Sequence, residues 1–107
     1  MITEISTDPA VLLSEKGYCV VVFYASWCGD CKRSYIYEKN LSKEFEGTVK
    51  FYRMDAEEYE PIANKYGVEN YPTFVFFQDN LFIEGNIDEP ESEDEIRQWL
   101  LNKISKN

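Results

Sequence analysis

Two cysteines separated by two residues, Cys28 and Cys31, are the part of the sequence best suited to do chemistry. They follow a continuous apolar stretch over residues 18–24, which is typical of a strand buried on both faces. From Cys31 onward the sequence favours a helix, with no helix breaker before Gly47. The cysteine pair is therefore expected where a central strand passes into the N-terminus of a helix.

A helix N-terminus favours an ionised sulfur. Free N–H groups and the positive end of the helix dipole stabilise a thiolate relative to a thiol. The thiolate is the species that attacks a disulfide, so this position predicts that Cys28 is a nucleophile. A spacing of three residues across the first helical turn also brings the two sulfurs within bonding distance. The pattern therefore predicts reversible disulfide chemistry.

The elements that must position this pair follow from the periodicity of apolar residues. Strands are expected over residues 2–5, 18–24, 49–54, 73–78 and 81–84. Helices are expected over residues 10–16, 31–45 and 56–66, and again after residue 92. Capping and turn residues set the boundaries: Asp8 with Pro9, Gly17, Asp55, Gly67, the pair Asp79 and Asn80, and Ser92 with Glu95.

The resulting order, β-α-β-α-β-α-β-β-α, defines the expected fold class. A βαβ crossover followed by a hairpin and a terminal helix predicts an α/β protein with a mixed sheet of four to five strands and helices on both faces. We expect one domain over residues 1–107. The cysteine pair then lies at the carboxyl end of the central strand, where open α/β sheets usually bind their ligands.

Charge and composition exclude several classes of function. The net charge of −9, from 20 acids and 11 bases, argues against nucleic-acid binding. We expect a cytoplasmic protein without membrane contact, because neither a signal peptide nor an apolar run of about 18 residues is present. The sequence contains no signal for an oligomer, and we expect a monomer. A zinc site usually needs four ligands, and the sequence has no histidine and only one further cysteine, Cys19. We therefore expect no metal, and we interpret Cys19 as a core residue, with a regulatory thiol as the alternative.

The motif around the cysteines extends beyond the pair itself. Trp27 and Lys32 flank Cys-Gly-Asp-Cys, and Tyr71-Pro72-Thr73 precedes a later strand. In these features, and in its whole length and element order, the chain resembles thioredoxins. The resemblance implies the thioredoxin fold and no cofactor. It also implies disulfide-bearing protein substrates and a thioredoxin reductase as the electron donor.

The resemblance assigns a role to each matching residue. Cys28 would be the exposed nucleophile that forms a mixed disulfide, and Cys31 the more buried thiol that resolves it. Pro72 matches the family's cis-proline, which packs against the cysteines. The residues expected to contact the substrate are Trp27, Gly29, Lys32, Tyr71 and Pro72.

Four positions depart from the pattern of that family. Asp30 replaces the usual proline between the cysteines, and Val22 replaces the buried acid six residues before the first cysteine. The lysine that pairs with this acid is matched by Phe51, and the proline that kinks the long helix by Ile36. These departures bear on the rate, the redox potential and the choice of partner.

Asp30 supports two functional hypotheses beside the simple one of a solvated residue at a helix start. Its carboxylate should disfavour the thiolate of Cys28 and so make the cysteine couple more reducing. In the absence of an acid at Val22, it could also accept the proton of Cys31. We therefore place Asp30 beside Cys28 and Cys31 among the candidate catalytic residues.

Three functions remain open on sequence grounds. The first is a reductase of protein disulfides, and the second is a binding module with the same fold and little turnover. The third keeps the chemistry but reverses it, as a disulfide oxidase or isomerase; Asp30 and the lack of a leader both argue against it. Reduction of an insulin-type disulfide that depends on Cys28 separates the first function from the second.

Overall fold

The computed structural model describes residues 2–12 and 16–106 and contains nine helices and strands in the predicted order. The strands are β1 (Ile2–Glu4), β2 (Tyr18–Tyr24), β3 (Val49–Asp55), β4 (Thr73–Gln78) and β5 (Leu81–Asp88). The helices are α1 (Pro9–Leu12), α2 (Gly29–Glu44), α3 (Glu60–Lys65) and α4 (Glu93–Ser105). None of the helices in the described part of the chain is long and apolar enough to span a bilayer.

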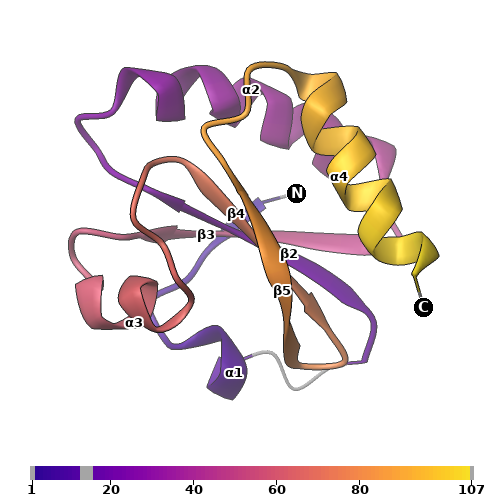
Figure 1. Ribbon diagram of the computed structural model, residues 1–107, viewed down its shortest axis with the longest axis horizontal. Helices are drawn as coiled ribbons and strands as arrows, with labels where there is room; N and C mark the ends of the chain where they lie inside the picture. Colours follow the sequence, from indigo (N-terminus) through magenta and orange to yellow (C-terminus); the bar gives the residue numbers. More distant parts are fainter. Residues whose placement is uncertain (1, 13–15, 107) are drawn as a thin grey trace.

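The five strands form one mixed sheet in the order β1-β3-β2-β4-β5. β3 pairs parallel with both β1 and β2, whereas β4 pairs antiparallel with both β2 and β5. Helices α2 and α4 cover one face of the sheet, and α1 and α3 cover the other (Figure 1). This arrangement confirms the predicted mixed sheet with helices on both faces and fixes the number of strands at five.

The central strand β2 is buried on both faces because it contributes to two apolar layers. Val20 and Val22 pack in the layer that contains Leu41 of α2. Val21 and Phe23 pack in the opposite layer, which contains residues of α3. Successive side chains of a strand point to opposite faces, so an uninterrupted apolar run is what this location requires.

Several boundaries differ from those predicted, most of all at the end of β5 and at the start of α3. Strand β5 continues to Asp88, which pairs with Thr73, although the sequence around Gly85 is typical of a loop. Asp55 does not cap a helix directly: its Oδ1 accepts hydrogen bonds from the N–H groups of Glu57 and Glu58 and so caps a turn. Helix α3 then begins at Glu60, because a proline is best tolerated in the first helical turn. The expected continuation of α1 over residues 13–15 lies outside the described residues.

The last helix begins as predicted and packs against the sheet through its inner face. The Oγ of Ser92 accepts a hydrogen bond from the N–H of Glu95 at 3.1 Å, which satisfies one of the free donors of α4. Ile96 and Leu100 on its inner face are fully buried against the sheet. This packing fixes α4 beside α2 on the face of the sheet that α2 also covers.

We expect Leu100→Ala to lower the free energy of unfolding by about 2–5 kcal/mol, because it leaves a cavity beneath α4. The neighbouring Leu101 is 41% exposed, and Leu101→Ala should change the free energy of unfolding by less than about 0.5 kcal/mol. Urea denaturation of both variants measures the difference. Equal losses in the two variants would contradict the packing described for this helix.

Candidate active site

Cys28 lies at the end of the short connection between strand β2 and helix α2. It is the N-cap of α2, with extended backbone angles, and its Sγ accepts a hydrogen bond from the N–H of Cys31 at 3.2 Å. The same thiol donates to the carbonyl oxygen of Tyr71 at 3.6 Å. The sulfur therefore occupies the place that a serine or aspartate oxygen usually takes at a helix start.

The exposure of Cys28 corrects one expectation. The resemblance implied an exposed nucleophile, but Cys28 is only 7% exposed, compared with 2% for Cys31. The capping interaction turns the sulfur inward, where both cysteines pack with Ala25 and Tyr71. The predicted order of burial is correct, because Cys31 is the more enclosed of the two.

Cys31 is held in its protonated form by its surroundings. The pKa of the Cys31 thiol is raised to about 12. Burial is the main cause, and the hydrogen bond with Cys28 and the negative charge of an ionised Cys28 add to it. The backbone of Ala25 and the charge of Arg53 partly offset this rise. The two thiols are thus in contact but in different environments, and only Cys28 caps the helix.

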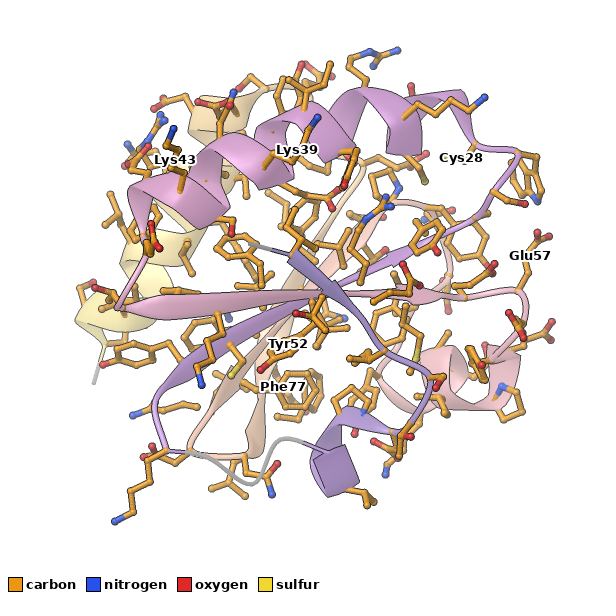
Figure 2. The ribbon with its side chains drawn as sticks, turned by 180° about the vertical axis from the view of Figure 1, so that it is seen from behind. Cys28, Lys39, Lys43, Tyr52, Glu57 and Phe77 are labelled. Carbon is orange, nitrogen blue, oxygen red and sulfur yellow. The ribbon has the colours of Figure 1, made fainter. Side chains whose placement is uncertain are left out.

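A groove of about 390 Å³ opens over Cys28. It is lined by Trp27, Cys28, Gly29, Asp30, Glu69, Asn70, Tyr71 and Glu89. The ring of Trp27 is 65% exposed and meets the ring of Tyr71 edge to face, with their centroids 6.1 Å apart. Figure 2 shows Cys28 at the N-terminal end of α2, with Glu57 at the same end of the molecule and Lys43 at the other end of the helix.

The predicted substrate-contact residues fall into three places. Trp27, Gly29 and Tyr71 line the groove with Cys28. Pro72 is buried and is not among the residues that line the groove, and its peptide bond with Tyr71 is cis, as the resemblance implied. Lys32 instead lines a second cavity, on the side of Cys31.

Asp30 lies on the outer side of the first turn of α2. Its carboxylate is 3.0 Å from a guanidinium nitrogen of Arg33, and both side chains are more than half exposed. Asp30 and Cys28 line the same groove. Cys31 lines a different cavity, and Asp30 is not among the residues that line it. This geometry favours the hypothesis that Asp30 acts on Cys28 over the one in which it takes the proton of Cys31.

Sequence reasoning missed a buried ion pair beneath the site. Glu38 of α2 is fully buried, and its Oε1 accepts a hydrogen bond from the Nε of Arg53 at 2.8 Å. Arg53 belongs to β3 and lies directly opposite Val22 of β2 in the sheet. The hydroxyl of Ser34 completes the cluster, at 2.9 Å from Oε2 of Glu38 and 3.2 Å from the carbonyl oxygen of Cys31.

The sequence did contain a signal for this cluster. The inner face of α2 consists of residues spaced three and four apart, namely Cys31, Ser34, Glu38, Leu41 and Ser42. An inner stripe of this kind is normally apolar, so a glutamate within it indicates a buried partner of opposite charge.

The geometry of the site agrees with comparisons to known proteins. Residues 5–102 match the family model described as Thioredoxin. The chain belongs to the thioredoxin family. Thioredoxin-1 of Caenorhabditis elegans is 37% identical over 86 residues, which cover 80% of this chain and 72% of that protein. The thioredoxin of Borreliella burgdorferi is 43% identical over 58 residues, or 53% of this chain and 49% of that protein.

A solved structure supports the fold of this thioredoxin-family chain. The thioredoxin of Fasciola hepatica superposes with a TM-score of 0.73 at 29% identity, covering 86% of both chains. Some relatives are longer than the matched stretch, which spans 34% of the chloroplastic thioredoxin M3 of rice and 49% of the Borreliella protein.

The buried carboxyl group gives this thioredoxin-family chain a distinct response to pH. Burial raises the pKa of Glu38 to about 7, against the opposing charge of Arg53 and the hydrogen bonds from Ser34 and Arg53. The folded protein therefore holds this proton to a higher pH than the unfolded chain, in which glutamate titrates near its usual pKa of about 4.3. The proton stabilises the fold at pH values below the unfolded pKa, and this contribution is lost as the pH rises through about 7.

We expect Glu38→Gln to remove this dependence. Between pH 5 and pH 8, the free energy of unfolding of the unmodified protein should fall relative to that of Glu38→Gln, by at most about 3 kcal/mol. Denaturant titrations at several pH values measure the slope. Glu46→Gln, which changes an exposed carboxylate just beyond the same helix, should retain the slope of the unmodified protein. Parallel curves for the unmodified protein and Glu38→Gln would contradict the assignment.

Proposed function

We propose that this protein is a thiol-disulfide oxidoreductase that reduces disulfides of other proteins through Cys28 and Cys31. The observation that supports the proposal most directly is the position of the Cys28 sulfur. It lies at the N-terminus of α2, accepts a hydrogen bond from the N–H of Cys31 and lines a groove of about 390 Å³. Family membership over residues 5–102 supports the same chemistry.

The reaction uses two exchanges. The Cys28 thiolate attacks one sulfur of the substrate disulfide and forms a mixed disulfide, while the other substrate sulfur leaves with the electron pair and takes up a proton. Cys31 then attacks the Cys28 sulfur, which forms the Cys28–Cys31 disulfide and releases the second substrate thiol. Two electrons pass to the substrate, and a thioredoxin reductase would restore the dithiol. We also propose that the protein acts as a monomer. We propose a reducing compartment such as the cytoplasm, because three cysteines there suit redox chemistry rather than a disulfide scaffold.

Reduction of insulin by dithiothreitol tests this function. The protein should accelerate the reaction, and Cys28→Ser and Cys31→Ser should each lower the catalysed rate at least about a hundredfold, because each removes one of the exchanging sulfurs. Cys19→Ala changes a core residue outside the site and should retain most of the rate. An unmodified protein no faster than Cys28→Ser, with a tightly bound partner, would instead support a binding module.

The charge around the groove suggests which substrates the protein prefers. Asp30, Glu69 and Glu89 line the groove. The carboxylates of Glu57, Glu60 and Asp55 are also close enough to act on Tyr71, another residue of the groove: burial is the main cause of its raised pKa, and these negative charges raise it further. Since opposite charges across an interface favour association, we propose that the groove favours disulfides flanked by lysine or arginine.

Paired peptides can measure this preference. At low ionic strength, a disulfide peptide with flanking lysines should be reduced with a kcat/KM about three- to tenfold higher than the same peptide with flanking glutamates. About 0.5 M salt should remove most of the difference, because screening weakens exposed charges. Glu69→Gln with Glu89→Gln should reduce the preference, whereas Glu91→Gln, outside the groove, should leave it unchanged. Equal rates for both peptides would refute the proposed selectivity.

A further inference from the structure

Cys31 lines a cavity that is distinct from the substrate groove. The cavity has a volume of about 220 Å³ and is lined by Tyr24, Ala25, Ser26, Cys31, Lys32, Tyr35 and Arg53. Its charged residues are two cations, Lys32 at the surface and Arg53 from the sheet. The resolving thiol therefore borders a space of positive charge, whereas the groove over Cys28 is lined by acids.

The guanidinium group of Arg53 is held in place from several directions. It lies over the rings of Tyr24 and Tyr35, at 4.0 and 4.5 Å from their centroids. Its Nε donates to Glu38, and its side chain is only 15% exposed. Two aromatic faces and a buried carboxylate fix both the position and the orientation of a planar cation. The charge that faces the cavity of Cys31 is thus a fixed one.

Glu38 has a different relation to Cys31. Its carboxylate reaches the first turn of α2 only through the hydroxyl of Ser34, which contacts the backbone carbonyl of Cys31 and not its sulfur. Glu38 is therefore poorly placed to take the Cys31 proton directly. The same group is well placed to hold Arg53, because its Oε1 accepts a hydrogen bond from the Nε of Arg53 at 2.8 Å.

Resolution of the mixed disulfide requires an ionised Cys31. Cys31 must lose its proton in a buried site, which burial opposes, and Arg53 is the side-chain charge that lowers its pKa. In the mixed disulfide Cys28 carries no charge, so the repulsion between the two sulfurs disappears. Burial then still raises the pKa of the Cys31 thiol, whereas the backbone hydrogen bond of Ala25 and the charge of Arg53 lower it.

We propose that Arg53, positioned by Glu38, Tyr24 and Tyr35, stabilises the Cys31 thiolate while that thiolate resolves the mixed disulfide. The proton of Cys31 passes to water. The thiolate attacks the Cys28 sulfur, the bond between the two cysteines forms, and the bond from Cys28 to the substrate breaks. The substrate sulfur leaves with the electron pair and is protonated by water. All four residues are positioning residues, since none of them touches the exchanging sulfurs in this role.

Several other charged groups face this cluster and enter its pH dependence. Glu4 accepts a hydrogen bond from the hydroxyl of Tyr24 at 2.7 Å, and its charge also acts on Glu38. The pKa of Tyr24 is raised chiefly by burial and by Glu4, and the charge of Asp55 at the end of β3 adds to this rise. The ammonium group of Lys39 lies over the ring of Tyr35, 4.8 Å from its centroid. Lys32 lines the cavity itself. These groups are common to all the variants below, so differences between variants report the charges of Arg53 and Glu38.

The test measures the two exchanges separately and rests on the proposed function. Reduced protein is mixed with 5,5′-dithiobis(2-nitrobenzoate), a disulfide whose released thiolate absorbs at visible wavelengths. Attack by Cys28 releases one thiolate, and resolution by Cys31 releases the second. Cys31→Ser should stop after the first release. A protein whose first release does not depend on Cys28 would refute the proposed function, whereas a normal first release isolates the role of Arg53.

Arg53→Gln keeps an amide donor for Glu38 but removes the charge. We expect it to slow the second release about tenfold at neutral pH and to raise the pH of half-maximal rate by about one unit, since a tenfold effect corresponds to one pK unit. The first release should change less than about threefold. Arg53→Lys should recover much of the rate, because it restores the charge. Should Arg53→Gln not fold, the double variant Arg53→Gln with Glu38→Gln replaces the ion pair by two amides and should show the same slow second release.

Two further variants make the outcome decisive. Arg97 of α4 is a matched control, because it also forms ion pairs, with Glu93 and with Glu44 at the C-terminal end of α2. Arg97→Gln removes this cation far from the cysteines and should leave both releases unchanged. Glu38→Gln keeps a side-chain oxygen that accepts the hydrogen bond from the Nε of Arg53, so the guanidinium should stay in place. This variant should therefore leave the second release equal or faster, because it removes only the opposing charge. A second release in Arg53→Gln equal to that in Arg97→Gln would overturn the proposal. A tenfold loss in Glu38→Gln alone would also overturn it, since Glu38 would then be the proton acceptor.

Discussion

The hydrogen bond from the N–H of Cys31 to the sulfur of Cys28 is the interaction on which the site depends. It makes a sulfur the cap of helix α2, so the reactive atom lies in the field of the helix N-terminus. This geometry requires that the strand before it cannot shift. Strand β2 meets that requirement because it is paired on both sides, by β3 and β4, and packed on both faces.

The two sulfurs of one pair occupy different electrostatic surroundings. Cys28 lines a groove bordered by Trp27 and by carboxylates, whereas Cys31 borders a cavity that contains Arg53. Under the proposed function, a substrate would meet the first sulfur from an acidic side, and the second sulfur would act from a basic side. The two steps of disulfide exchange would then take place in two environments, although the cysteines are separated by only two residues.

Much of this arrangement was predictable from the sequence, because local patterns determine it. The apolar run of β2, the cap at Ser92 and the cysteines at a helix start each depend on neighbouring residues, and all three are correct. The burial of Cys28 was not predictable, since it depends on Tyr71, which lies 43 residues away. Glu38 was missed for the same reason: a charged residue is normally exposed, and only the strand order brings Arg53 to it.

The most direct test of the central claim is the order in which the thiols react with a small alkylating agent. Reduced protein is treated with limiting iodoacetamide at neutral pH, and the label is mapped by peptide mass. We predict modification of Cys28 at least about tenfold faster than that of Cys31 and Cys19, because only Cys28 caps the helix and meets the groove. Faster or equal labelling of Cys31 would contradict the account.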